Sequence, residues 1–528
     1  MKVQKTLQRF CSFFLLALLV SIGARAAGNC DGSGNCYVRA GATGTGTGAN
    51  WTNACTGFTG ACDVTNSALR GTTLWVAVGS YGSPTFSAAD SGTSVITIEA
   101  ATTANHGPAS DWSSSYAGQA VFGGGTSIST DYWTFTGQSW GSACSGLPVC
   151  NVDAAYNILF HNTTGVDPTI LITGSRTNHH FDHVDLYGYN TANTDDDGLE
   201  CDSACNYFYF GYGYIHETGG NPILSNNGQT AGSGCPHTYE YDYIYKNHMS
   251  KDGTHAEAFS ETSCGLTARY SVFQDICSSG VITTASAGNA SMNGRAFYGN
   301  IVFWDATYAA NNGSGQLATL DDSVLDFLGE VMSGTVYFVN NTIAGIYSTV
   351  ATQTGVGFSS MPIGGDTYST GTPIVIEENN LWYASAWTGN DYSPYCGSVS
   401  CATGTVQDYD AFFVGSIPSS VFSNPTETHG YTVSTASTNP FTNYSSFTVA
   451  GFQLATPDPF SIYAGSAVTN AGTYYTGVGT TMATNTFNVD MYGTTRGADG
   501  IWDRGALQIS GTSSTAPNPP SGLTATVQ

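Results

Sequence analysis

The sequence predicts an all-β chain wound into a solenoid, and the first observation behind this is a repeat. Seven segments rich in β-branched and aromatic residues recur with starts 25, 31, 29, 28, 40 and 39 residues apart. Their local alternation is typical of half-buried strands, and a period in this range is typical of a coil whose repeats cover one another's apolar faces. The segments are Phe181–Asn190, Asn206–Thr218, His237–Asn247, Leu266–Ile276, Gly294–Ala306, Gly334–Ile346 and Pro373–Ala384.

The second observation is a polar residue that recurs inside these segments. Asp242, Ser271 and Asn300 are spaced by 29 and 29 residues, and Asn341 and Asn380 follow after 41 and 39. In a coil, these side chains would stack where the backbone turns between strands, each one capping the next. The pattern therefore predicts a coiled sheet and not a sandwich of two sheets.

Each repeat is expected to contain a second strand before its recurring segment. These strands are predicted at Gly198–Ala204, Pro222–Gly228, His255–Glu261, Gly280–Ser286 and Gly315–Asp322. The two long spacings predict inserted loops around Asp305–Gly315 and Ile346–Gly371. The loop-rich stretch Pro394–Pro459, with weak strands at Ala411–Val414 and Phe447–Phe452, is expected to cover the C-terminal end of the coil, where open strand edges would invite aggregation.

Residues 1–26 are expected to be a secretory signal peptide. Lys2, Lys5 and Arg9 precede the apolar run Phe10–Ile22, and small residues surround a cleavage site before Ala27. No later run approaches the length of a membrane span. The mature protein is therefore expected to be secreted, either extracellular or at the cell surface.

Charge narrows the choice of partners. The whole chain has 13 Lys and Arg against 38 Asp and Glu, and its formal net charge is −25. Nucleic acid is an unsuitable partner because phosphate binding needs a basic surface. An anionic polysaccharide is also harder to bind unless divalent cations bridge the charges. The chain has no phosphate-binding loop, lipase elbow or zinc-protease helix, and no organic cofactor is expected.

Cysteine usage agrees with export. Thirteen cysteines remain after the signal peptide, and most form close pairs: Cys30/Cys36, Cys55/Cys62, Cys144/Cys150, Cys201/Cys205 and Cys396/Cys401. Cys235 and Cys264 lie one repeat apart, and Cys277 is left alone. Local disulfides are favoured over zinc because the pairs lack the compact foursome of a zinc site.

Both ends of the predicted coil resemble a known superfamily. Cys36–Trp51 (CYVRAGATGTGTGANW) resembles the opening of secreted right-handed parallel β-helix proteins of the pectate-lyase-like superfamily, and Asp490–Ile509 resembles their closing stretch. In the latter, Asp490, Gly493, Arg496, Asp503, Gly505 and Ala506 match, while Arg504 and Leu507-Gln508 depart from the pattern. His255–Ile276 and Val336–Gly345 fit the central repeats. The resemblance implies one right-handed parallel β-helix domain over residues 27–511. The Pro-rich tail 512–528 resembles the first strand of a fibronectin type III domain and is expected to be a linker or remnant.

Candidate chemistry lies between residues 179 and 269, which hold seven of the ten histidines. In His255–Glu261, alternation is expected to turn His255, Glu257, Phe259 and Glu261 outward and the small residues inward. Stacking would then line one wall with Glu200, Asp202, Asn226, His255, Glu257 and Glu261. For a lyase, the predicted catalytic residues are Lys251, His255, Glu257 and Arg269, and the predicted calcium ligands are Glu200, Asp202, Glu257 and Glu261.

The resemblance implies a carbohydrate-active protein, a polysaccharide lyase or a glycoside hydrolase working with two carboxylates. The alternative is a non-catalytic adhesin, matrix or assembly-forming protein that binds cell-surface glycans or self-associates. Plainer interpretations stay open: outward carboxylates are often only solvated, and Asp195–Asp197 fits a calcium loop or a solvated turn. The pair His179-His180 is expected on a surface turn. The aromatic runs Tyr207–Tyr214 and Tyr239–Tyr245 are expected to stack on the sheet.

Overall fold

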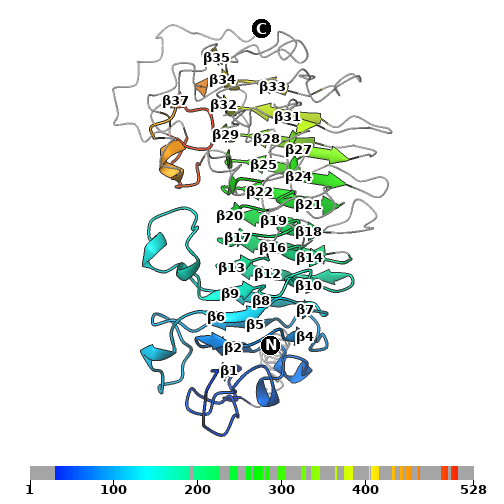
Figure 1. Cartoon of the computed structure of the whole chain (residues 1–528), viewed down its shortest axis with the longest axis vertical. Coiled ribbons are helices and arrows are strands. Elements are labelled where there is room, and N and C mark those ends of the chain that lie inside the picture. The colour runs from blue at the N-terminus through cyan, green and yellow to red at the C-terminus, as the bar shows by residue number, and fades with distance from the viewer. Residues whose placement is uncertain are drawn as a thin grey trace, which may run out of the picture.

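The structure is a computed structural model built almost wholly of parallel strands (Figure 1). It describes residues 30–189, 196–203, 205–225, 237–247, 257–262, 266–276, 280–285, 295–303, 323–328, 335–344, 363–364, 374–384, 404, 406–414, 431–433, 440–443, 448–452, 454, 462–463, 489–496 and 501–508. Within these ranges there is no α-helix, and the only helical turns are short 3-10 turns.

Three long parallel sheets form the walls of the coil, and we name them A, B and C. Sheet A comprises β1 (Asn35–Val38), β2 (Thr73–Val76), β5 (Ile96–Ala100), β8 (Trp133–Thr136), β12 (His179–Asp182), β16 (Phe208–Gly211), β19 (His237–Glu240), β22 (Leu266–Arg269), β25 (Arg295–Tyr298), β28 (Thr335–Val339), β31 (Ile374–Glu378) and β33 (Val406–Asp408).

Sheet B comprises β3 (Gly79–Ser80), β6 (Ala120–Gly123), β9 (Ile158–His161), β13 (Val184–Tyr187), β17 (Tyr214–His216), β20 (Tyr243–Tyr245), β23 (Val272–Gln274), β26 (Ile301–Phe303), β29 (Thr342–Ala344), β32 (Leu381–Ala384), β34 (Ala411–Val414) and β35 (Tyr431–Val433). Sheet C comprises β4 (Thr85–Phe86), β7 (Thr126–Ile128), β10 (Ile170–Ile172), β14 (Leu199–Cys201), β18 (Ile223–Ser225), β21 (Phe259–Thr262), β24 (Gly280–Ala285), β27 (Ser323–Leu328) and β30 (Ile363–Gly364).

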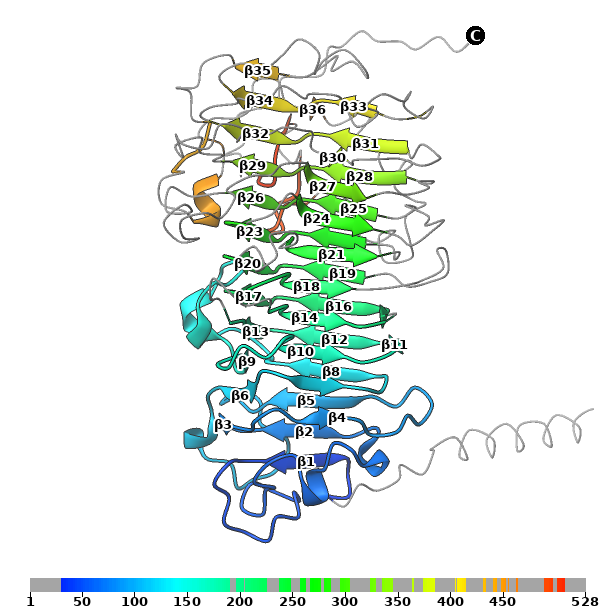
Figure 2. The ribbon, with the colours of Figure 1, turned by 45° about the vertical axis from the view of Figure 1, so that its right-hand side comes forward.

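The chain visits the sheets in the order A, B, C and then returns to A one rung higher, so the strands climb in sequence order (Figure 2). Two short parallel strands, β11 (Arg176–Thr177) and β15 (Cys205–Asn206), add a local pair, and β36 (Ile462–Tyr463) pairs antiparallel with β37 (Ile501–Trp502). Crossovers between parallel strands are right-handed in about 98% of cases. The chain is a right-handed parallel β-helix, which confirms the predicted fold class.

Each recurring segment in the sequence spans a sheet A strand, a corner and a sheet B strand. At that corner, the predicted polar ladder is present. Backbone N–H groups of one rung donate to side-chain oxygens of the next at 2.5–3.1 Å, along the series Gly213, Asp242, Ser271, Asn300, Asn341, Asn380 and Asp410. Asp242 and the residues above it in this series are completely buried. Because buried polar groups must be paired, this ladder lets the backbone turn inside the protein.

The residue before each ladder position has left-handed backbone geometry. Tyr212, Tyr241 and Tyr270 have φ angles of 53°, 58° and 55°, and Gly299 in the next rung has 67°. This conformation is uncommon for residues other than glycine. It bends the chain from sheet A to sheet B and directs a column of tyrosines outward.

The interior is filled by side chains stacked in register. Phe135, Phe181 and Phe210 lie on successive rungs of sheet A, and the first two rings are parallel with centroids 5.0 Å apart. Burial of such rings on every rung makes each turn of the coil depend on its neighbours.

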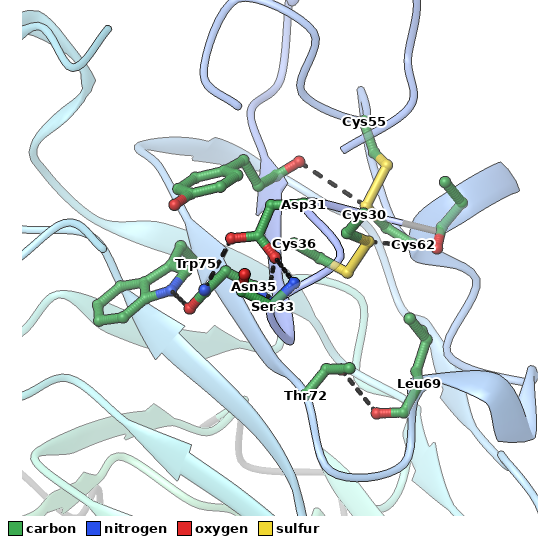
Figure 3. The surroundings of a disulfide bond; sticks show 12 residues. Cys30, Asp31, Ser33, Asn35, Cys36, Cys55, Cys62, Leu69, Thr72 and Trp75 are labelled. Carbon is green, nitrogen blue, oxygen red and sulfur yellow. Dashed lines mark hydrogen bonds between the residues drawn. A yellow bond between two sulfur atoms is a disulfide. The ribbon is translucent and has the colours of Figure 1, made fainter. Parts of the chain in front are cut away.

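Four of the predicted cysteine pairs form disulfides: Cys30–Cys36, Cys55–Cys62, Cys144–Cys150 and Cys201–Cys205. The first two lie together beneath β1, where Asp31 accepts hydrogen bonds from the backbone of Ser33 and Asn35 (Figure 3). This region covers the N-terminal end of the coil. Cys235, Cys264, Cys277, Cys396 and Cys401 lie outside the described residues, as do both terminal segments, residues 1–26 and 512–528.

Two predictions about elements need correction. Phe447–Phe452 is not a strand where it is described, because Val449–Phe452 forms a 3-10 turn whose Phe452 packs on Phe303 of sheet B. This part of the C-terminal stretch therefore lies beside the coil. The pair His179-His180 lies in β12, with His179 fully buried, and not on a surface turn. The predicted strand Gly315–Asp322 lies outside the described residues, and the sheet C strand described next in the chain is β27.

Candidate functional site on the outer face of sheet B

Charged and aromatic side chains gather on the outer face of β13, β17 and β20. We call this surface, with the corner residues that flank it in sheets A and B, the central face. Strand pairing places Asp185, Tyr214 and Tyr243 in one row, and Tyr187, His216 and Tyr245 in a second row. The residues between them, such as Ile215 and Ile244, point into the core. The alternation of a strand therefore supplies both a core side and a polar outer side.

Asp185 and His216 form a buried pair in this face. His216 Nε2 lies 3.1 Å from Asp185 Oδ1, and both side chains are almost inaccessible to solvent. Burial raises the pKa of Asp185 to about 6, although the hydrogen bond with His216 opposes that rise. Asp153 Oδ1 lies 3.8 Å from the same His216 nitrogen, and its side chain is half exposed.

Asp153 reaches the central face from a segment that covers the lower part of sheet B (Figure 2). It begins the 3-10 turn Asp153–Ala155, which follows the disulfide Cys144–Cys150. Tyr156 donates a hydrogen bond to the Cys150 carbonyl at 2.8 Å and packs parallel to Tyr214. We name residues 137–157 the covering segment.

A second charged pair lies at the far end of the sheet B strands. Glu217 and Lys246 follow β17 and β20 in left-handed conformation, and Lys246 Nζ lies 3.4 Å from Glu217 Oε1. Tyr187 OH donates to Glu217 Oε2 at 3.4 Å. Burial, and then the charge of Glu217, raises the pKa of Tyr187.

A third charged group lies at the opposite end, where sheet A meets sheet B. Arg269 Nε donates to Glu240 Oε2 at 2.6 Å, and Arg269 Nη1 donates to Tyr298 OH at 2.9 Å. Tyr209 OH donates to Glu240 Oε1 at 3.0 Å. Burial lowers the pKa of Arg269, but the neighbouring Tyr298 and Glu240 together raise it, so the guanidinium stays charged.

Beside this group runs the aromatic column of the corner. The centroids of His183, Tyr212, Tyr241 and Tyr270 follow one another at 4.9, 4.8 and 5.2 Å. The rings of His183, Tyr212 and Tyr241 are nearly parallel, which confirms that the aromatic runs stack on the sheet. Because these rings cover one another's faces, they offer little ring face to a sugar.

Of the four predicted catalytic residues, Arg269 lies at the central face. Lys251 and His255 are outside the described residues. Glu257 is described, but it is buried at the bend before β21, where Asn221 Nδ2 donates to Glu257 Oε2 at 2.9 Å. Its predicted outward exposure is therefore wrong, and it does not share a surface with Arg269.

The face assignment in this strand is reversed for a physical reason. Phe259 is fully buried and stacks on Tyr239 at 4.1 Å, while Ser260 faces outward. The phenyl ring gains more from burial than Ala or Ser would, and in register it continues the inward row of Ile223.

Of the predicted calcium ligands, Glu257 does not reach the outer face of sheet C on which Glu200 lies. Glu200 is on the outer face of sheet C as expected, but strand pairing places it between Leu171 and Leu224. Asp202 follows β14 and accepts a hydrogen bond from Gly174 N at 2.5 Å. The backbone of Glu261 is in register with buried Ser225, and Glu257 is enclosed as described above. Asn226 lies outside the described residues.

Sequence reasoning missed Asp153 and Asp185, and used His216 only as one member of a histidine-rich region. Asp185 and His216 are 31 residues apart, close to one repeat, and this spacing could have placed them on neighbouring rungs. No comparable signal exists for Asp153, because the covering segment does not follow the repeat.

Among known proteins, the chain has a structural neighbour but no sequence match. No protein-family model and no curated protein matches the sequence. Among solved structures, the chain is similar to a PL6-family polysaccharide lyase from Pseudopedobacter saltans, with 10% identity and a TM-score of 0.33 over 70% of this chain and 91% of that one. In the described residues, no helix is long and apolar enough to span a membrane.

Proposed function

We propose that the chain is an exported protein that binds an acidic polysaccharide on the central face and cleaves it as a lyase. The observation that carries this proposal is the placement of its few cations. Eight Lys and Arg lie in the described residues, and Arg70, Arg295, Arg496 and Arg504 are buried. Of the four that reach solvent, Lys246 and Arg269 flank the outer face of sheet B on neighbouring rungs.

Lyase chemistry needs a cation beside the uronate carboxylate and a base for the proton on the adjacent carbon. Arg269 suits the first role because a guanidinium binds a carboxylate through two parallel hydrogen bonds. It has five N–H groups, and within the described part of the chain its contacts with Glu240 and Tyr298 account for three. Lys246, one strand length away, would hold the carboxylate of a neighbouring sugar.

The base remains a prediction from the sequence. In the sequence, Lys251 and His255 lie between β20 and β21, outside the described residues. Either side chain would remove the proton and allow the glycosidic oxygen to leave by β-elimination. Calcium is given no step in this scheme, because Glu257 is buried and does not reach the outer face on which Glu200 lies.

Export is supported by the predicted signal peptide and by the four disulfides, which are typical of oxidising compartments.

The test is incubation of the disulfide-intact protein with a panel of acidic and neutral polysaccharides. Absorbance of the unsaturated product and release of reducing ends are followed together. We expect both signals to rise on an acidic substrate, and Arg269→Ala to lower turnover at least 100-fold. Arg176→Ala is the matched control: Arg176 is also partly exposed, but it bonds the Thr173 carbonyl at another corner.

The remaining outcomes separate the alternatives. Reducing ends without absorbance would indicate a glycoside hydrolase. An Arg269→Ala protein with full lyase activity would remove Arg269 from the site. The absence of both signals across the panel would favour the non-catalytic adhesin or matrix protein. In such a protein, the stacked aromatic column and the Arg269–Glu240 ion pair would serve only to stabilise the fold.

A further inference from the structure

Three side chains from separate elements meet at the lower part of the central face. One carboxylate oxygen of Asp153, one of Asp185 and a ring nitrogen of His216 all lie within 4.8 Å of one another. Asp185 comes from β13, His216 from β17 and Asp153 from the covering segment. Strand pairing and a disulfide-closed segment thus bring together residues that are 63 positions apart in the sequence.

The hydrogen bonding of the Asp185 carboxylate in this cluster is incomplete among the described residues. Asp185 is fully buried, yet its Oδ2 has no hydrogen-bond partner among the described residues. Both oxygens of a carboxylate are bonded to one carbon, so Oδ2 lies beside the oxygen that contacts His216. A buried carboxylate oxygen without a partner is costly, and His216 satisfies only Oδ1. The site therefore contains a carboxylate oxygen, Asp185 Oδ2, that could bind a cation beside two further ligand atoms.

The imidazole ring of His216 is held in a fixed position by its neighbours. The His216 ring lies parallel to Tyr214 with centroids 4.0 Å apart and against Tyr187 at 4.3 Å. His161 packs on the other side of Tyr187, so the tyrosine ring separates the two histidines. A ring fixed in this way loses little freedom when its nitrogen binds a ligand.

The geometry points to a divalent metal site formed by Asp153, Asp185 and His216, suited to a first-row cation such as Zn²⁺ or Mn²⁺. One imidazole nitrogen with two carboxylates is a donor set for these ions, whereas Ca²⁺ takes six to eight oxygens. Asp153 is half exposed, so the coordination positions on its side face solvent. The site goes beyond the proposed lyase function and requires no polysaccharide.

Such an ion would join the covering segment to sheet B. Asp153 is the only ligand from that segment, and its position depends on the Cys144–Cys150 disulfide and on Gln119, whose Nε2 donates to the Asp153 carbonyl at 2.7 Å. Ion binding is therefore expected to protect the segment from proteolysis.

The test is calorimetric titration of the chelator-treated, disulfide-intact full-length protein with Zn²⁺, Mn²⁺ or Ca²⁺ alone, without any polysaccharide. We expect one equivalent of Zn²⁺ or Mn²⁺ to bind more tightly than Ca²⁺. Asp153→Asn and His216→Gln should each weaken that binding at least tenfold. Asp63→Asn is the matched control, since Asp63 is also a partly exposed aspartate but lies near the N-terminal end of the coil, where it accepts a hydrogen bond from Thr65 N.

Because Asp153 is half exposed, Asp153→Asn should fold normally, and far-UV circular dichroism checks this. Co²⁺ gives a second readout: its visible absorption should appear with the unmodified protein and disappear in Asp153→Asn. The proposal is overturned if no ion binds at one equivalent. It is equally overturned if Asp153→Asn and His216→Gln bind Zn²⁺ and Mn²⁺ as well as the unmodified chain does. Neither result bears on lyase activity, which is measured separately with Arg269→Ala.

Discussion

Asn300 illustrates how one side chain supports the corner of the coil. Its Oδ1 accepts from Ser271 N at 2.9 Å, and its Nδ2 donates to the Ala268 carbonyl and to Asn341 Oδ1. Asn300→Ala would leave the Ser271 N–H and the Ala268 carbonyl buried without these partners. Each such group costs about 1–3 kcal/mol, so we expect a loss of about 2–6 kcal/mol in the free energy of unfolding, measured by denaturant titration.

Ser271 supplies the matched comparison, because it fills the same corner with a hydroxyl that accepts from Asp242 N. Asn300→Ser should therefore lose less stability than Asn300→Ala. A loss below about 0.5 kcal/mol for Asn300→Ala would contradict the ladder's role, since that is the usual effect of a surface change.

At the scale of elements, the covering segment is the part of the central face that a disulfide holds. Replacing both Cys144 and Cys150 by Ser opens a loop with a sequence separation of 6. A loop of this size contributes roughly 2 kcal/mol in the chain-entropy description. We expect faster proteolysis within residues 137–157 and little change in the unfolding of the coil, because the sheet strands beneath keep their ladder hydrogen bonds. Limited proteolysis with mass spectrometry measures this.

The matched control is the double Ser replacement of Cys201 and Cys205, which join β14 to β15 away from this segment. Cleavage sites in residues 137–157 should stay protected in that variant. Equal protection in both variants would show that side-chain packing, and not the disulfide, holds the covering segment.

Elements differ in how far the sequence alone could predict them. Strands that form every rung leave a periodic signal, so the sheet A and sheet B strands within the seven recurring segments, and the polar residues from Asp242 to Asn380, are predictable from the sequence. The inward and outward faces of His255–Glu261 are not predictable in this way, because alternation fixes which residues share a face but not which face is inside. The large side chain of Phe259 makes its own face the buried one. Of the predicted catalytic residues, Arg269 lies at the candidate site, and its place follows from the repeat. Asp153 could not be predicted, because its position depends on a tertiary contact.

At the scale of the whole molecule, acidic residues are not confined to the solvated surface. Asp196, from the group expected to form a calcium loop or a solvated turn, is fully buried at the bend before β14. Its carboxylate accepts hydrogen bonds from Asn162 Nδ2 at 2.9 Å and from the backbone of Tyr189. Burial raises its pKa to about 7 even though these hydrogen bonds oppose the rise.

This shift predicts how stability depends on pH. An aspartate in the unfolded chain has a pKa near 3.9, so between about pH 4 and pH 7 the folded state holds a proton that the unfolded state has lost. The contribution of Asp196 is therefore fully present below about pH 4 and is lost as the pH rises through about 7. Other buried groups also change how stability depends on pH. Burial lowers the pKa of His179 to about 4, so its contribution to stability changes with pH in the opposite direction.

Asp196→Asn isolates the effect of Asp196 because an amide does not titrate. We expect the stability of the unmodified protein relative to Asp196→Asn to fall between pH 4 and pH 8, by on the order of 1 kcal/mol for each unit of pKa shift. Denaturant titrations of both proteins across this range measure the difference, and a difference that stays constant with pH would show that Asp196 is ionised in the folded protein throughout.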